Sequence, residues 1–169
     1  MKKLLALAVV ILGFTAVSFG QNSVTTSATS SATIIGSLNV TKTGNLDFGS
    51  IIPDPADLPS TVTLSANAAM TRTQSGGTTC IGSFSNMKFA VGGEATSKYS
   101  IVYPDDVTLT KTSAPSMIAT LSCSTAKTGN VISSVPVFYI GATLAVGKAS
   151  LQTAGLYESP SFNVVVAYE

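Results

Sequence analysis

The sequence contains no histidine and no tryptophan, and charged residues make up only 10% of its 169 positions. The absence of histidine removes the most common general base and the most common ligand of transition metals. The absence of tryptophan removes the largest aromatic surface on which a ligand could stack. The composition therefore argues against an enzyme, and we expect no catalytic residue, no cofactor-binding residue and no metal site.

The chain also lacks an excess of positive charge, with 9 basic and 8 acidic residues and a net charge of +1. Loss of an N-terminal leader containing Lys2 and Lys3 would leave a net charge of −1. Nucleic acids and anionic lipid surfaces attract strongly basic proteins. We therefore expect no nucleic-acid partner and, once the leader is removed, no membrane partner.

Carboxylates are few, and the one adjacent pair is Asp105-Asp106. Paired carboxylates can hydrolyse glycosides or hold calcium. Pro104 directly precedes the pair, however, and a Pro-Asp-Asp turn explains it without any chemistry. Neighbouring side chains on such a turn point apart.

The sequence has only two cysteines, Cys80 and Cys123. Two cysteines without histidine are too few ligands for zinc or an iron–sulfur cluster. In an exported protein they predict one disulfide, which would stabilise the fold by about 4 kcal/mol in the chain-entropy model. The alternative is two free thiols buried as small hydrophobic side chains.

The N-terminus has the pattern of an export signal. Lys2 and Lys3 precede an uncharged apolar run over residues 4–17, and Ser18-Phe19-Gly20 provides small residues for cleavage before Gln21. The run is shorter than the roughly 20 residues that a membrane-spanning helix needs, which makes a retained anchor the less favoured alternative. We expect residues 1–20 to be a cleaved signal peptide and the protein to be exported to the periplasm, the cell surface or the medium.

Residues 32–169 show short alternating segments, separated by turn residues about every 8–12 positions. This rhythm is typical of β-sandwiches and barrels, and no segment has the pattern of a helix of three turns. The sequence therefore predicts one all-β domain, a two-sheet sandwich of about ten short strands, the first over residues 32–40.

The preceding segment, residues 21–31, is a flexible or strand-forming tail. Over residues 21–33, Val24, Ala28 and Ala32 share one face of an extended chain, and the remaining residues are mostly Ser and Thr. Such a segment could add as a strand to the exposed sheet edge of a neighbouring subunit. An ordinary edge strand or a flexible tail is the simpler alternative.

The C-terminus predicts a strand that carries folding or assembly. Gly155 precedes a segment in which one face holds four large side chains: Phe162, Val164, Val166 and Tyr168. Fully buried, these four would contribute at most about 6–12 kcal/mol. Pro160 cannot donate to a sheet ladder, so pairing is expected to start after it.

Four pieces of the sequence together resemble a bacterial secreted family, domain of unknown function 4402. They are Leu-Asp-Phe-Gly at 46–49, Tyr-Ser-Ile-Val-Tyr-Pro at 99–104, the glycine-flanked segment 140–147, and Ala-Gly-Leu-Tyr at 154–157 followed by the strand 162–168. A glycine followed by a strand with a penultimate tyrosine is also similar to the C-terminus of chaperone–usher pilins and of spore coat protein U-like proteins.

The more distant resemblance implies an immunoglobulin-like or pilin-like sandwich, a periplasmic chaperone, and subunits that join through donated strands. We therefore expect an exported structural or adhesive surface protein, a pilin-like fibre or coat subunit without catalytic activity. Whether the last strand completes its own sandwich or that of a partner subunit stays open. The alternative is a monomeric secreted module that binds a glycan or protein through exposed tyrosines: Tyr99, Tyr103, Tyr139 and Tyr157.

Overall fold

The protein is all-β throughout the residues that the computed structural model describes, which are 23–133 and 136–169. These residues form twelve strands and no helix, which confirms the predicted fold class with two strands more than expected. The predicted signal peptide lies outside the described residues. The strands are β1 (Asn39–Thr43), β2 (Ser50–Ile52), β3 (Ser60–Leu64), β4 (Arg72–Gln74), β5 (Thr79–Ile81), β6 (Met87–Gly92), β7 (Lys98–Val102), β8 (Asp106–Leu109), β9 (Met117–Cys123), β10 (Asn130–Val131), β11 (Val137–Val146) and β12 (Val165–Tyr168).

The chain divides into an N-terminal unit that ends at Ile34 and a compact unit over Ile35–Glu169. Within the first unit, residues 23–34, here called the arm, form no strand, and all of them are exposed. In the compact unit the first strand starts at Asn39, later than the predicted residue 32. We call this compact unit the domain.

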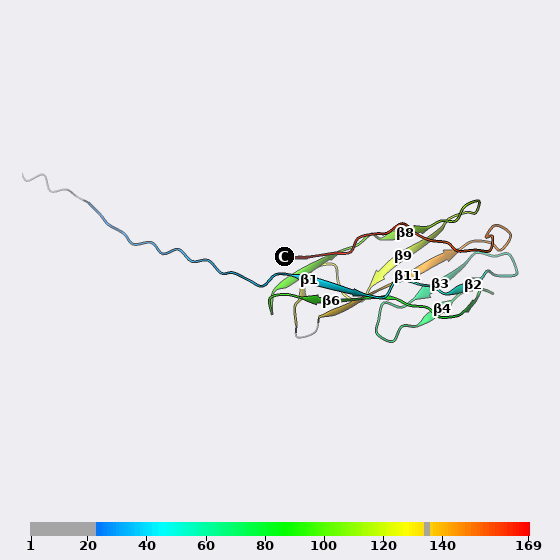
Figure 1. The fold of residues 1–169 in the computed structure, drawn as a ribbon, viewed down its shortest axis with the longest axis horizontal. Coiled ribbons are helices and arrows are strands. Elements are labelled where there is room, and N and C mark those ends of the chain that lie inside the picture. The colour runs from blue at the N-terminus through cyan, green and yellow to red at the C-terminus, as the bar shows by residue number, and fades with distance from the viewer. Residues whose placement is uncertain (1–22, 134–135) are drawn as a thin grey trace, which may run out of the picture. The chain divides into compact units, whose positions relative to one another are not determined.

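The long strand β11 organises the main, seven-stranded sheet (Figure 1). One edge of β11 pairs first with β6 and then with β3, and the other edge pairs with β9. The change of partner from β6 to β3 occurs at Gly141, where a side chain would collide with the backbone of Leu64 and Ala66. Strands β1, β4 and β8 extend the sheet by pairing with β6, β3 and β9.

The C-terminal strand β12 belongs to a second sheet, of order β10-β7-β12, and β2 pairs with β5 in a third. β12 is shorter than the predicted strand over 162–168 and starts at Val165, opposite Val102 of β7. Continued in the same register, pairing would bring Asn163 opposite Pro104, which has no N–H to donate. Pairing resumes further back along the chain, where Thr110 and Glu158 form a single bridge.

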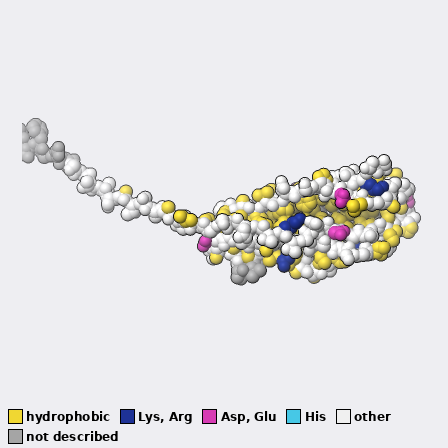
Figure 2. Space-filling model, viewed as in Figure 1, with side chains coloured by type: hydrophobic (Ala, Val, Ile, Leu, Met, Phe, Trp, Pro, Cys, Tyr) yellow, Lys and Arg dark blue, Asp and Glu magenta, His cyan; other side chains and the backbone are white. Residues whose placement is uncertain are grey.

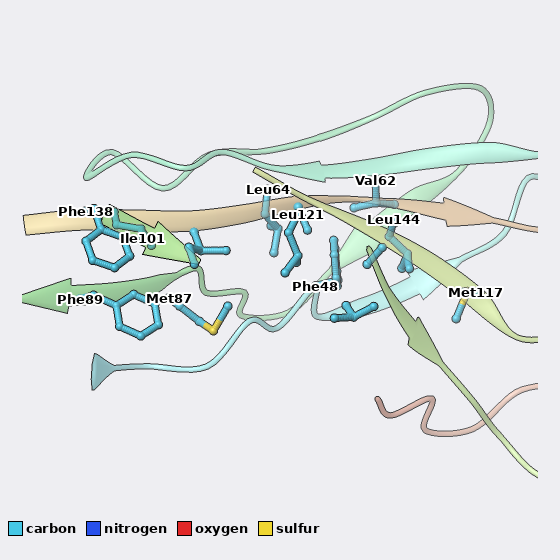
Figure 3. Close-up of a cluster of buried hydrophobic side chains, with 14 of the residues drawn as sticks. Phe48, Val62, Leu64, Met87, Phe89, Ile101, Met117, Leu121, Phe138 and Leu144 are labelled. Carbon is cyan, nitrogen blue, oxygen red and sulfur yellow. The ribbon is translucent and has the colours of Figure 1, made fainter. Parts of the chain in front are cut away.

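The core lies between the main sheet and β7, and it follows the predicted alternation of side chains. In β6 the odd-numbered residues Met87, Phe89 and Val91 are buried and their neighbours are not. Phe138 is fully buried and stacks on Phe89 with 4.9 Å between ring centroids (Figure 3). The buried apolar side chains are Phe48, Val62, Leu64, Met87, Phe89, Val91, Tyr99, Ile101, Val107, Met117, Ala119, Leu121, Ile132, Phe138, Ile140, Ala142, Leu144 and Val146.

Candidate functional site

The domain contains an apolar groove of about 1350 Å³, here called the seam. Residues 45–53, together with Val40 and Lys42 of β1, form one wall, and residues 152–164 form the other. Core side chains of four strands reach its floor: Met87, Phe89, Val107, Met117, Leu144 and Val146. In Figure 2 the surface is hollowed, and hydrophobic side chains are visible inside the hollow. The seam is therefore an opening in the hydrophobic core.

Both walls of the seam offer backbone groups without a partner in the described part of the chain. β1 pairs with β6 on one edge and with no strand on the other, and all five of its residues are exposed. The second wall ends at Val164, just before β12, which pairs with β7 on one edge only. Between Glu158 and Val165 the described structure has no backbone hydrogen bond. Unpaired strand edges of this kind readily accept another strand.

The four predicted side chains of the C-terminal segment lie beside this opening. Phe162, Val164, Val166 and Tyr168 are each half-buried and pack against the core, and the residues between them are exposed. Phe162 and Val164 line the seam itself. The partial exposure of these two side chains follows from the open seam, because they form part of its surface.

Gly155, the fifth predicted residue, also lines the seam. Its φ of +140° lies in a region that glycine adopts freely and other residues rarely do. A side chain at this position would also meet the aliphatic part of Lys111. The glycine therefore permits the bend that brings the C-terminal segment back along the domain.

A hydrogen-bond network, here called the Tyr168 clamp, joins the two ends of the domain. The Tyr168 hydroxyl donates to the carbonyl of Gly36 at 2.8 Å and accepts from the backbone N–H of Glu94 at 2.7 Å. The Glu94 carboxylate in turn accepts from the N–H of Gly36 at 3.1 Å. Gly93 leaves room for the hydroxyl, since a side chain there would collide with it. Sequence reasoning missed Gly36 and Glu94, because no periodic pattern marks them.

The predicted disulfide between Cys80 and Cys123 is wrong, because both cysteines are free. Cys80 lies in β5 and Cys123 in β9, strands that are not neighbours in any sheet. Both side chains pack half-buried against the core, and Cys123 Sγ lies 3.7 Å from Thr125 Oγ1. Burial raises the pKa of the Cys80 thiol, against the opposing effect of Arg72. The thiols thus behave as small hydrophobic side chains, the alternative considered above.

A reducing agent is therefore expected to leave the thermal stability unchanged. Thermal unfolding followed by circular dichroism should give the same Tm with and without dithiothreitol, because no covalent link is available to break. Alkylation in denaturant without reductant should label both Cys80 and Cys123. A Tm that falls on reduction, together with unlabelled cysteines, would contradict the free-thiol structure.

The other residues considered for chemistry do not converge on a site. Asp105 binds Lys127 at 2.6 Å, whereas Asp106 accepts a hydrogen bond from Thr120, so the two carboxylates point to different partners. The described residues contain no cluster of three potential metal ligands. The same part of the chain contains no helix long and apolar enough to cross a bilayer.

The tyrosines offer little free ring surface for stacking. Tyr99 is buried, with 3% of its surface exposed. The Lys127 ammonium lies 4.7 Å from the ring centroid of Tyr103, and Lys111 lies 5.8 Å from that of Tyr157. Of the four tyrosines considered for ligand binding, Tyr103 and Tyr157 thus already have a lysine over one face of the ring.

Comparison with known proteins gives one match. The family model described as Domain of unknown function (DUF4402) matches residues 38–168, which spans β1 to β12 and both walls of the seam. Neither the curated proteins nor the solved structures contain a match to this chain.

Proposed function

Since this chain belongs to the DUF4402 family, whose description assigns no activity, we propose its function from the seam. It is an exported structural or adhesive subunit of the cell surface, pilin-like or coat-like, that assembles when a β-strand from another chain fills its seam. In this proposal the protein has a structural role and no catalytic activity.

The observation that carries this proposal is an apolar groove bordered on one side by the unpaired edge of β1 and on the other by a C-terminal segment, residues 159–164, that makes no backbone hydrogen bond in the described structure. An added strand would supply hydrogen-bond partners to β1 and to the C-terminal segment, and its side chains would cover the exposed core. Strand addition of this kind takes affinity from backbone hydrogen bonds and specificity from side-chain pockets. A ligand of ordinary size would satisfy the apolar floor but leave the backbone edges unpaired.

The same open seam supports a periplasmic chaperone as a temporary partner. Exposed strand edges and core side chains favour aggregation before assembly. A carrier that covers the seam during export would prevent this and would be displaced by the final strand. The leader pattern of residues 1–20 supports a location outside the cytoplasm.

A monomeric binding module is the less supported alternative. It would need accessible tyrosines, but Tyr99 is buried and a lysine lies over one ring face of Tyr103 and of Tyr157. A glycan array provides a direct comparison, because binding that is lost in the Tyr139→Ala variant would favour this alternative over assembly.

We expect the protein, expressed as residues 1–169 in its own host, to form species larger than a monomer. Light scattering after size-exclusion chromatography should show multimers, and negative-stain microscopy of the purified protein and of native cell surfaces should show fibres or a coat. Monomers alone in solution, with bare cell surfaces, would overturn the proposal.

A further inference from the structure

The arm has the composition of a strand that could fill the seam. Residues 23–34 carry no charge, and in an extended chain their even-numbered side chains include Val24, Ala28, Ala32 and Ile34. The odd-numbered side chains are all Ser or Thr. Ile34 is 97% exposed and Val24 is 86% exposed. One face of the arm is thus suited to an apolar floor and the other to water.

The sequence offers the arm a route into the seam of its own domain. Ile35-Gly36-Ser37-Leu38 can form a two-residue hairpin, since Gly-Ser is a favoured pair for the type II′ turn. Such a hairpin would lay the arm along the free edge of β1. Two features of the domain oppose this route.

The first is the register that the hairpin would impose between the arm and β1. A hairpin with Gly36-Ser37 at its tip places Thr33 opposite Val40 and Ser31 opposite Lys42, and directly opposed residues point to the same side of a sheet. Val40 and Lys42 face the seam. The arm would therefore turn its hydroxyl face to the apolar floor and its apolar face to water. A shift of one residue reverses this, but the tight turn fixes the register.

The second is the Tyr168 clamp. A type II′ turn requires a positive φ at its first central residue, here Gly36. Gly36 does not have a positive φ in the structure. Its N–H is bound by Glu94 and its carbonyl by Tyr168, so the hairpin would have to break both contacts or strain them.

On the basis of the proposed function, we propose that the seam of each domain is filled by the arm of a second copy of this chain. Residues 23–34 enter with Val24, Ala28, Ala32 and Ile34 toward the floor. The Tyr168 clamp selects this arrangement by keeping each arm out of its own seam. An arm from another copy has no turn to fix its register, so it can present its apolar face.

Cross-linking between two tagged forms of the full chain tests which arm fills which seam. Both forms carry Cys80→Ser and Cys123→Ser; one adds Ala28→Cys in the arm and the other Val164→Cys in the seam, and the two are expressed together. We expect a disulfide that links chains carrying different tags. A second pair of forms, with Ala32→Cys in place of Ala28→Cys, tests the possibility that the arm binds in another register. A third form that carries both new cysteines reports on filling within one chain.

The outcomes separate this inference from the function on which it rests. Cross-links confined to single chains of the third form would overturn filling by a second copy. Multimers that form without any cross-link from either arm position would show that another segment fills the seam, and would leave the assembly function standing. Absence of multimers in the unsubstituted protein would overturn both.

The Tyr168→Phe variant tests the clamp, because it removes the hydroxyl and keeps the ring. Loss of its two hydrogen bonds should raise the ratio of monomer to multimer roughly tenfold. Tyr139→Phe is the control, since Tyr139 of β11 is also a half-buried tyrosine but belongs neither to the lining of the seam nor to the clamp. An unchanged ratio in a folded Tyr168→Phe protein would overturn the selecting role of the clamp.

Discussion

Replacing Phe138 with alanine is expected to lower the free energy of unfolding by about 3–5 kcal/mol, the usual cost of removing a buried phenylalanine ring. Phe138 is fully buried in β11 and stacks on Phe89 with an angle of 9° between the rings. The substitution leaves a cavity beside the strand that joins β6, β3 and β9, so the surrounding chain has little freedom to collapse into it. The rest of the core would lose its contacts with the ring as well.

Urea unfolding followed by circular dichroism measures this change, since the chain has no tryptophan to report by fluorescence. Ile118→Ala in β9 is the control, because Ile118 is 50% exposed and its removal should cost no more than about 1 kcal/mol. Similar losses for the two variants would contradict the placement of Phe138 at the centre of the core.

The Val164→Asp variant is expected to abolish assembly. Val164 lines the seam, so a carboxylate at this position stays hydrated while the seam is open and loses its water when a strand enters. An unpaired ion that loses its water costs several kcal/mol, which corresponds to at least about a hundredfold loss in the equilibrium constant for assembly. The isolated domain should suffer less, because its half-open seam leaves the charge in contact with solvent.

Val165→Asp is a matched control one residue away. Val165 is 51% exposed and lies on the opposite face of the C-terminal segment. The substitution introduces the same charge and the same loss of strand propensity without entering the seam. Light scattering should therefore find multimers for Val165→Asp and monomers for Val164→Asp, and equal behaviour of the two would count against the seam as the contact surface.

The sequence predicts the fold class well, because period-two alternation is a local property. Met87, Phe89 and Val91 can be identified as inward-facing without any knowledge of what they pack against. The same pattern correctly identifies the four C-terminal residues that alternate with exposed neighbours. It does not give the extent of pairing. β12 begins only at Val165, because in this register Asn163 would lie opposite Pro104, just beyond the end of β7.

The seam could not be predicted, because alternation shows which face of a strand points inward and not which edge lacks a neighbour. The Tyr168 clamp was equally inaccessible, since the bond from Tyr168 to Gly36 spans 132 positions of the chain. The disulfide prediction failed for a related reason. An even number of cysteines in an exported chain permits a bond, but the bond also needs the two Cα atoms within about 7 Å of each other. That distance is set by the tertiary fold, and in this fold both cysteines are free.

If the proposed assembly forms a filament, the Tyr168 clamp determines how tension enters each domain. A pull on the arm enters the domain at Gly36, which is tied directly to the last strand and to the turn after β6. The load is thus shared by both ends of the domain before it reaches the ladder between β1 and β6. The three hydrogen bonds of the clamp would be the first contacts to break, and the apolar core would stay closed until they did.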